Sequence, residues 1–393
     1  RPMQNTNVLI SGASVAGPAL AYWLGRYGFQ PTVVEEAPAL RSGGYAVDFR
    51  GPAHLQVLEH MGVLKELRRL QTGGSPLRFV DETGRQLLYL PGEFAGGDVE
   101  ILRSDLSRVL YEHSRDTTEY LFGDSIAAMT QTADSVQVSF ERGAERTFDL
   151  VIGADGLHSN VRRLTFGPES GSVSYLGYYL AGWEVPNYLN LGHESLMYNL
   201  PGKLASVGGI HRDSTKANTL FVFASPPLDY DRRDLQQQKK LVADAYAGVG
   251  WEVPTLLKGL WDAEELYFDS ISRVDLQPWS AGRVTLVGDA ACGATLGGMG
   301  TGTAVVAAYV LAGELASAGG DHRVAFAHYE EAVRGYAHGT QKGGDRTGKF
   351  LAPRSKMGMQ LRNRLLSNRL LLKLMLKAGQ QVSGTITLKD YPG

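Results

Sequence analysis

Residues 8–36, VLISGASVAGPALAYWLGRYGFQPTVVEE, place the strongest constraint on how this chain can fold. An apolar segment runs into a glycine turn at Gly12, a helical segment follows, and a second apolar segment ends at Glu35. Gly12 lets the chain turn tightly out of the first strand, and Gly17 lets the helix pack closely against the sheet. This order predicts a βαβ unit that opens a parallel sheet.

The same unit has the features of a nucleotide site. The N-terminus of its helix would face a pyrophosphate, and the Glu35 carboxylate would accept both hydroxyl protons of an adenosine ribose, which favours FAD or NAD. Ser14 replaces the middle glycine of the usual G-x-G-x-x-G pattern, and its small side chain still lets the backbone approach phosphates. A lone glycine turn is typical of many α/β proteins, but the strand, the helix and Glu35 together favour dinucleotide binding.

Two later segments repeat the strand-to-glycine pattern. They are FDLVIGADGLHSNVRR at residues 148–163, where the strand runs into Asp155, and RVTLVGDAACGATLGGMGTGTAVVAAYVLAGEL at residues 283–315, where it runs into Gly288 and Asp289. The carboxyl ends of parallel strands meet at one edge of a sheet, and ligands bind there. We therefore expect Asp155 and Asp289 to converge on the cofactor side.

Composition excludes several classes of protein. The chain has 393 residues, 43% of them hydrophobic, and a formal charge of −2, which gives no electrostatic footprint for nucleic acid. No apolar run is long enough for a membrane-spanning helix, so we expect no membrane insertion. Cys292, the single cysteine, excludes a disulfide framework and a multi-cysteine metal site, and we interpret it as a small apolar filler. With no signal peptide visible, we expect a cytoplasmic monomer without a metal.

The three motifs, in this order and at these separations, resemble the class A (single-component) FAD-dependent aromatic monooxygenases with the para-hydroxybenzoate hydroxylase fold. The resemblance spans about the first 340 residues. It is strongest to the branch of tetracycline-inactivating monooxygenases, because RSGGYAVDFRG at residues 41–51 and ILRSDLSRVL at residues 101–110 also match. It implies FAD as cofactor, NADPH or NADH as transient reductant and molecular oxygen as co-substrate. The implied reaction is hydroxylation of an aromatic or polycyclic small molecule through a flavin C4a-hydroperoxide.

The resemblance also implies roles for individual residues. Glu35 would hold the adenosine ribose, Asp48 and Arg103 would contact FAD, Asp289 would bind the ribityl chain, and Arg41 would help to hold NADPH. The Asp155 turn, supported by Arg162, would lie near the pyrophosphate and also take part in nicotinamide use, and the resemblance does not divide the two roles between its residues. The expected cofactor-binding set is Gly12, Ser14, Ala16, Gly17, Glu35, Glu36, Arg41, Asp48, Arg103, Asp155, Gly288, Asp289, Gly300 and Thr301.

Two positions depart from the family pattern. Glu36 replaces the basic residue that usually follows the ribose acid, and the loop after Asp289 reads CGATLGGMG, without the usual histidine and prolines and one residue shorter. Glycines at 297, 298, 300 and 302 would still let the flavin ring touch the backbone. The helix that begins near Gly300 would then direct the positive end of its dipole at the flavin pyrimidine edge.

The segment at residues 164–274 is rich in β-branched and aromatic residues between glycine, proline and aspartate turns, which predicts a second, antiparallel sheet. The resemblance implies that this sheet roofs the flavin and binds substrate, with Tyr198, His211 and Phe223 as candidate contacts. Because side chains alternate along a strand, about half of the aromatic residues belong to the core, and a core role is the more common one for each. No general base can be identified.

We therefore predict an α/β fold with a Rossmann-like FAD-binding domain, a β-sheet substrate domain and C-terminal helices. The FAD-binding domain would comprise residues 3–165 and 275–340, the substrate domain residues 166–274, and the helical segment residues 341–393. Residues 341–380 hold ten Lys or Arg and one Asp, with leucines at helical spacing. Such a helix can dock onto its own domain or form a membrane-surface or acidic-partner patch, and docking is the more common outcome.

Two other functions are compatible with the same motifs. The first is a non-redox cyclase or rearrangement enzyme of secondary metabolism that keeps FAD structurally, which the altered loop after Asp289 suggests. The second is a flavin-holding protein that sequesters a ligand without turning it over. Arg41, Asp48, Arg103 and Asp289 are all present and favour the hydroxylase.

Overall fold

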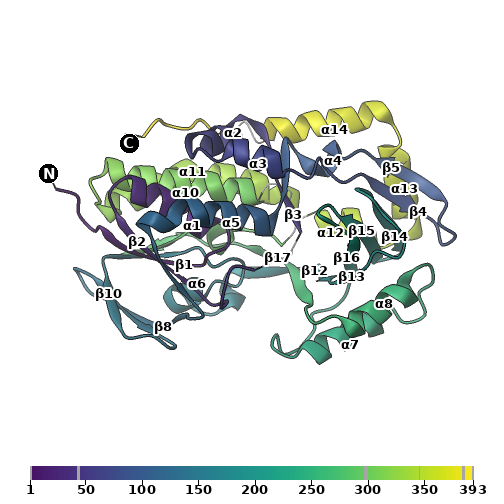
Figure 1. Ribbon diagram of the computed structural model, residues 1–393, viewed down its shortest axis with the longest axis horizontal. Helices are drawn as coiled ribbons and strands as arrows, with labels where there is room; N and C mark the ends of the chain where they lie inside the picture. Colours follow the sequence, from purple (N-terminus) through teal and green to yellow (C-terminus); the bar gives the residue numbers. More distant parts are fainter. Residues whose placement is uncertain (1, 42–44, 296–299, 345, 383–385, 392–393) are drawn as a thin grey trace.

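The protein is described here by a computed structural model that covers residues 2–41, 45–295, 300–344, 346–382 and 386–391. Two large β-sheets lie side by side, and helices cover both of them (Figure 1). The mixed α/β class predicted from the sequence is confirmed. No helix of the described residues is both long and apolar enough to cross a membrane.

The first sheet has six strands in the order β18-β19-β11-β1-β2-β7. β1 pairs in parallel with β2 and with β11, and β11 pairs in parallel with β19. Ser11, Gly153 and Leu286 are aligned in register, so the three glycine turns predicted from the sequence leave the sheet at the same edge. The strands are β1 (Asn7–Ser11), β2 (Gln30–Glu35), β7 (Glu119–Phe122), β11 (Leu150–Gly153), β18 (Ser280–Ala281) and β19 (Val284–Leu286).

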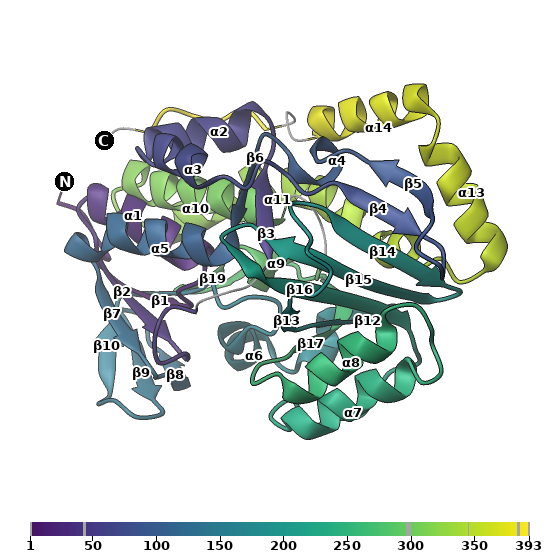
Figure 2. The same ribbon diagram turned by 45° about the vertical axis from the view of Figure 1, so that its right-hand side comes forward.

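Helices pack on one face of this sheet, and a three-stranded sheet lies on its other side (Figures 1 and 2). The helix α10 is buried on nearly all sides because α1 and α11 enclose it, which explains its alanine- and valine-rich sequence. The helices are α1 (Ala16–Arg26), α2 (Gly51–His60), α3 (Leu64–Leu70), α5 (Arg103–Ser114), α6 (Asn160–Phe166), α9 (Asp289–Cys292), α10 (Gly300–Ser317) and α11 (His322–Gly344); the small sheet contains β8 (Ile126–Gln131), β9 (Val136–Phe140) and β10 (Arg146–Phe148).

The second large sheet has eight strands and is antiparallel at most of its pairings, as predicted. The hairpin of β4 and β5 joins it from residues 77–90, which lie in the stretch assigned from the sequence to the FAD-binding domain. β4 pairs with β14 in parallel. The strands are β4 (Leu77–Val80), β5 (Gln86–Leu90), β12 (Val173–Gly182), β13 (Glu184–Pro186), β14 (Ser195–Leu200), β15 (Lys203–Ile210), β16 (Asp213–Ala224) and β17 (Tyr267–Val274).

Both faces of the eight-stranded sheet carry a hydrophobic core. One face packs against α7 (Leu235–Ala245) and α8 (Val253–Asp262), and the other against α12 (Thr347–Leu351) and α13 (Lys356–Leu366) (Figure 2). Side chains alternate between the two cores, as the neighbours Tyr178 and Tyr179 show. A two-stranded sheet of β3 (Ala46–Phe49) and β6 (Val99–Leu102) and the short helix α4 (Glu93–Gly96) complete the fold.

The basic C-terminal segment forms α12, α13 and α14 (Arg369–Val382) instead of one helix. α13 docks on the sheet through Leu366 and through Arg362, which lies over the Phe79 ring and donates a hydrogen bond to Asn199 at 2.7 Å. The predicted docking is therefore partial, because α13 keeps Leu361 (57% exposed) and α14 keeps Leu370 (67% exposed) at the surface.

Residues 386–391 return to the first sheet and pack on α10. Tyr391 occupies the space beside Gly313, and its hydroxyl donates a hydrogen bond to Glu314 at 3.0 Å. Tyr309 donates a hydrogen bond to the Lys389 carbonyl at 2.6 Å. The C-terminal segment therefore contacts the second sheet and the helix α10 of the first domain.

Tyr246, directly after α7, gives a test of how the helices dock on the second sheet. Its buried hydroxyl lies within hydrogen-bond distance of the Leu204 carbonyl (2.6 Å) and the Val222 carbonyl (2.9 Å). We expect Tyr246→Phe to lower the free energy of unfolding by about 1–2 kcal/mol, because buried carbonyls lose a donor. Urea unfolding followed by fluorescence would measure the loss. The control is Tyr188→Phe, because Tyr188 is exposed. An equal loss of unfolding free energy in the two variants would contradict the assignment.

Candidate cofactor and substrate site

The first strand-end turn is closed to any side chain at two positions. Gly12 has φ +110°, and a Cβ added there would overlap the Ala154 carbonyl oxygen. A Cβ at Gly17 would overlap the carbonyl of Gly12, so the first turn of α1 rests directly on the end of β1. Ala16, beside Gly17, is also buried. Close packing of the turn against Ala154 and against the end of β1 therefore requires glycine at both positions.

Glu35 and Arg103 flank this turn. The Glu35 carboxylate accepts hydrogen bonds from the backbone N–H of Ala13 (3.1 Å) and from that of Ala37 (2.7 Å). The Arg103 guanidinium donates to the Ser14 hydroxyl from Nε (3.0 Å) and Nη2 (2.8 Å), although 89 residues separate the two positions. The serine in place of the middle glycine thus holds an exposed cation above the turn.

The Asp155 carboxylate is engaged within the protein. It accepts hydrogen bonds from the Ser11 hydroxyl (3.1 Å), from the backbone N–H groups of Asn160 (3.0 Å) and Val161 (3.1 Å), and from the Ser159 hydroxyl. Burial raises its pKa, and these hydrogen bonds oppose the rise. The side chain caps α6 and joins the turn after β11, which is the second strand-end turn, to β1. Any cofactor contact at this turn would therefore be made by the backbone of the turn.

Two cations support the same turn. Arg162 is buried and donates hydrogen bonds to the Leu157 carbonyl (2.6 Å) and to the Ala290 carbonyl (3.0 Å), which ties the second turn to the third. The His158 ring lies between two carboxylates, Asp269 on β17 (2.7 Å) and Glu169. The second turn is therefore anchored to the third turn and to the second sheet.

The third turn brings Asp289 near Arg103. Gly288 has φ +70°, and Asp289 follows it at the start of α9. Burial raises the pKa of the Asp289 carboxyl, and the charge of Arg103 opposes that rise. The Asp289 charge raises the pKa of Tyr267 on β17 and the Arg103 charge lowers it, so Tyr267 lies near both side chains. Side chains from both sheets thus meet at the shared edge of the strands.

The first turn of α10 packs on a buried histidine. A Cβ at Gly302 would overlap the His54 ring. His54 Nδ1 accepts the Arg50 N–H at 2.9 Å, so its Nε2 carries the proton and donates to the Tyr336 hydroxyl at 2.6 Å. Burial lowers the pKa of His54 to about 4, which keeps the ring neutral. Gly300 and the half-buried Thr301 begin this helix; glycines 297 and 298 lie outside the described residues.

Asp48, Arg41 and Glu36 lie around the site in different ways. Asp48 is buried and forms an ion pair with Arg50 at 2.5 Å; burial raises its pKa to about 6, and Arg50 opposes the rise. Arg41 and Glu36 are exposed. Asp48 already has a cationic partner, and the two exposed side chains are available for contacts with ligands.

The three candidate substrate residues do not come together. Tyr198 and Phe223 lie in the core between the second sheet and α7–α8, at 6% and 3% exposure, as the core interpretation expects. His211 follows β15, where its ring contacts His193 and its Nε2 lies 3.1 Å from the Ser75 hydroxyl. This arrangement does not support one substrate site made of the three.

Sequence reasoning missed an aromatic pair that joins the segment before β3 to the second large sheet. The Tyr45 hydroxyl donates to the Thr219 carbonyl at 3.0 Å, in the space that a Cβ at Gly182 would fill, and its ring lies edge-on to Tyr267 at 6.3 Å. The Tyr45 carbonyl accepts the N–H of Arg103 at 3.0 Å. A glycine within β12 was the available signal, because it marks a close approach by another group.

The arrangement fits a dinucleotide. A glycine turn with no room for side chains, an acceptor carboxylate at the end of β2 and a cation above the turn match the polyphosphate and ribose of such a ligand. Among the described residues, no group of three or more His, Cys, Asp or Glu is placed to hold a metal ion. The fold and site define a dinucleotide-binding flavoprotein class.

Comparisons with known proteins agree. The family described as FAD binding domain matches residues 5–326. A flavin-dependent monooxygenase of Legionella longbeachae is 37% identical over 393 residues. The alignment covers 99% of this chain and 99% of that relative. The crystal structure of tetracycline destructase Tet(55) superposes with TM-score 0.84 at 37% identity, and that of Tet(51) with 0.86 at 34%, each covering 98% of this chain and 99% of the other. The chain belongs to this family and is an FAD-dependent monooxygenase.

The His158 cluster predicts a dependence of stability on pH. Burial lowers the pKa of His158, but hydrogen bonds to Asp269 and Glu169 and their charges raise it to about 9. Because the pKa is higher in the folded state than in the unfolded chain, protonation favours folding. The stabilisation is complete below the unfolded pKa of about 6.5, and it disappears as the pH rises through about 9.

We expect the free energy of unfolding to fall by ~2 kcal/mol over that window, after allowance for partial exposure. Urea unfolding at closely spaced pH values would measure it. His158→Gln should flatten the profile between pH 6.5 and 9, whereas His328→Gln, at a more exposed ion pair, should not. An unchanged profile in His158→Gln would contradict the assignment.

Proposed function

We propose that this protein is an NAD(P)H-driven monooxygenase that uses molecular oxygen to hydroxylate an aromatic or polycyclic small molecule, and that a tetracycline-like scaffold is the first substrate class to test. The observation that carries the proposal is the convergence of the Gly12 turn, Arg103 and Asp289 at one sheet edge, beside side chains of the second sheet. The similarity to the two tetracycline destructases supports the substrate class.

The residues around the first turn would hold the cofactor. Glu35 would bind the adenosine ribose, the backbone at Gly12 would approach the pyrophosphate, and Arg103 would neutralise charge there. Asp289 would accept hydroxyl protons of the ribityl chain. Bound FAD would supply the redox chemistry, namely acceptance of a hydride from the nicotinamide and activation of dioxygen.

The protein itself positions and shields the reactants. The N–H groups in the first turn of α10 present a positive dipole end, and His54 packed behind Gly302 fixes that turn in place. Tyr45 packs edge-on against Tyr267 of the second sheet, and its carbonyl accepts the Arg103 N–H, so this pair fixes Arg103 beside the second sheet. Arg41 is exposed and would meet the reductant, and Asp48 holds Arg50 in an ion pair.

The decisive experiment mixes the FAD-loaded protein with NADPH, and separately with NADH, under anaerobic conditions. Tetracycline and a panel of polycyclic phenols are added in parallel, and the absorbance of oxidised flavin is followed. Bleaching that one compound accelerates, followed by an oxygenated product after air is admitted, would establish the proposal. Oxidised flavin that persists with both nicotinamides would contradict it and favour the non-redox cyclase, and bleaching without product would favour ligand sequestration.

Glu35 gives a test of the cofactor geometry that does not need a substrate. An amide group cannot replace both acceptor oxygens, so Glu35→Gln loses one acceptor for the ribose and for the backbone N–H groups it now binds. We expect FAD affinity to fall by a factor of about ten, equivalent to the loss of one hydrogen bond. Fluorescence quenching on titration of the apoprotein would measure it. Glu59→Gln, an exposed change on α2, is the control, and equal affinities in the two variants would refute the assignment.

A further inference from the structure

The helices α13 and α14 carry more than half of the large apolar side chains that the described residues expose. Figure 2 shows both helices at the outer edge of the molecule, beyond β5. Single exposed apolar residues are normal, but a contiguous group of them marks an interaction surface. The residues, which we call the C-terminal patch, are Met357, Leu361 and Leu365 on α13 and Leu370, Leu371, Leu374 and Met375 on α14.

The part of the patch on α14 faces away from the rest of the protein. Leu370 and Leu374 lie four residues apart, which places them on one side of the helix. Leu371 and Met375 repeat that spacing one position further on and broaden the same side. Leu372 packs against the core of the second sheet, and at about 100° per residue it lies roughly opposite Leu370 and Leu374. The helix therefore docks by one side and presents apolar side chains on the other.

The helix α13 repeats this arrangement. Met357, Leu361 and Leu365 follow one another at intervals of four residues and are all exposed. Leu366, by contrast, is buried in the core of the second sheet. Only two residues separate the end of α13 from the start of α14. Two consecutive helices thus each dock by one side and leave an apolar side uncovered.

Five exposed cations accompany the patch, and none of them forms an ion pair within the described part of the chain. Residues 346–389 contain no Asp or Glu, although the whole chain has a formal charge of −2. The positive charge is therefore local to this segment, and it complements a negatively charged partner. The five cations are Lys356 and Arg364 on α13 and Arg369, Lys373 and Lys377 on α14.

The side chains of this surface suit anionic lipid better than protein. Protein interfaces are rich in aromatic residues and poor in Lys, whereas the patch has no aromatic residue and Lys supplies most of its cations. A second copy that docked through the same face would bring like charges together, which is unfavourable. At a bilayer surface, Lys and Arg stems lie along the apolar layer while their charged ends reach the phosphate groups.

We propose that the C-terminal patch binds the surface of a membrane that contains anionic lipid. The helix α14 lies in the plane of the headgroups, with its leucines in the acyl boundary and its cations at the phosphates. Binding of this kind is reversible and leaves the fold unchanged. The inference does not depend on the proposed monooxygenase function. It places the second sheet, which carries both helices, at a surface into which apolar polycyclic molecules partition.

Flotation of the full FAD-loaded chain with lipid vesicles tests the proposal without any measurement of activity. Phosphatidylcholine vesicles with and without phosphatidylglycerol are compared at low and high salt. We expect binding to the anionic vesicles that weakens at high salt, because salt screens exposed charges. Neutral vesicles should bind much less. No binding to the anionic vesicles, or equal binding to both kinds, would overturn the proposal.

The apolar contribution is tested with Leu374→Gln. We expect this change to weaken binding to anionic vesicles about fivefold, because one apolar side chain no longer enters the acyl boundary. Val324→Gln is the matched control, since Val324 is an exposed apolar residue on α11 outside the patch. It should bind as the unmodified protein does. Equal weakening in the two variants would rule out the patch as the membrane contact.

The charge contribution is tested with a pair of lysine changes, Lys373→Gln together with Lys377→Gln. Binding to anionic vesicles should fall about fivefold for each charge removed. Lys240→Gln together with Lys258→Gln, exposed positions on α7 and α8, is the matched control and should bind normally. FAD affinity should be the same in both pairs, because all four side chains are exposed. An equal loss of vesicle binding in the two pairs would show that overall charge, not the patch, causes the binding.

Two further measurements identify other occupants of the patch. Light scattering over a range of protein concentrations detects self-association, and a dimer that Leu374→Gln dissociates would assign the patch to a second copy. Binding to poly-glutamate without binding to anionic vesicles would assign it to an acidic protein. Either outcome would overturn the lipid proposal.

Discussion

The close approach of the first strand-end turn to the second is the constraint on which the rest of the site depends. Because Gly12 has no side chain, its backbone lies against the Ala154 carbonyl, and the Ala154 N–H donates to the Ser11 carbonyl at 2.8 Å. The Gly12 N–H donates to the Val34 carbonyl at 2.8 Å on the other side. The end of β1 is thereby fixed between β2 and β11. This backbone register determines where Glu35 and the second strand-end turn lie, and no surface side chain can alter it.

A few polar and aromatic contacts then fix the second sheet relative to that edge. His158 joins the second turn to Asp269 on β17, and Tyr45 reaches from the segment before β3 to the Thr219 carbonyl on β16. These contacts are directional, unlike the apolar packing of each core, so they define an orientation as well as an association. Arg162, buried between the second and third turns, supports the same edge from within the first sheet. The space between the sheets is therefore shaped by residues outside both hydrophobic cores.

The parts of the fold that depend on local sequence patterns could be predicted. The βαβ unit at residues 8–36, the parallel order of the strand-end turns and the antiparallel second sheet follow from periodicity and glycine positions. Contacts between distant residues were not predictable: Ser14 with Arg103, and β4 in parallel with β14. Because side chains alternate along a strand, the sequence left open which face of the sheet carries Tyr198 and Phe223. The structure shows that α7 and α8 cover the face on which both lie. Asp155 was predicted beside the cofactor, and its capping of α6 depends on a loop geometry that no sequence pattern specifies.

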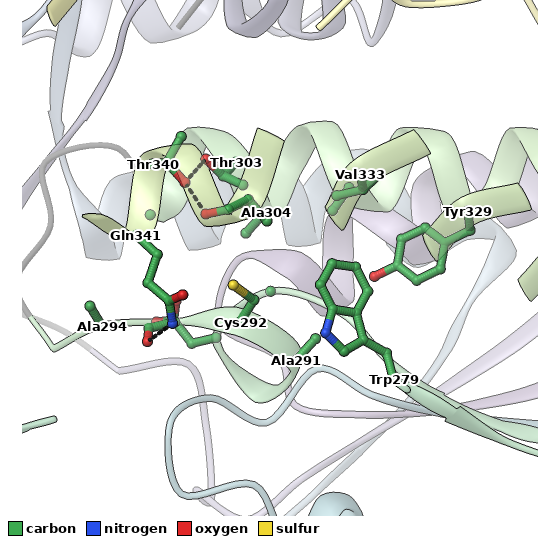
Figure 3. Close-up of a pocket in the computed structure, with 16 residues that line it drawn as sticks. Trp279, Ala291, Cys292, Ala294, Thr303, Ala304, Tyr329, Val333, Thr340 and Gln341 are labelled. Atoms are coloured by element: carbon green, nitrogen blue, oxygen red, sulfur yellow. Dashed lines mark hydrogen bonds between the residues drawn. The ribbon is translucent and has the colours of Figure 1, made fainter. Parts of the chain in front are cut away.

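The composition of α10 explains a small cavity of about 30 Å³ between this helix, α11 and the turn at Asp289 (Figure 3). A helix enclosed on nearly all sides, with a first turn that must admit a flavin ring, needs small residues, and Gly300, Gly302 and Ala304 provide them. The small residues of α10, together with the rings of Trp279 and Tyr329, line the space that remains. At about 24 cal/mol per Å³, a cavity of 30 Å³ costs about 0.7 kcal/mol of stability. That cost is small beside the stability of a domain, so a fold that needs a backbone-lined flavin site can retain the space.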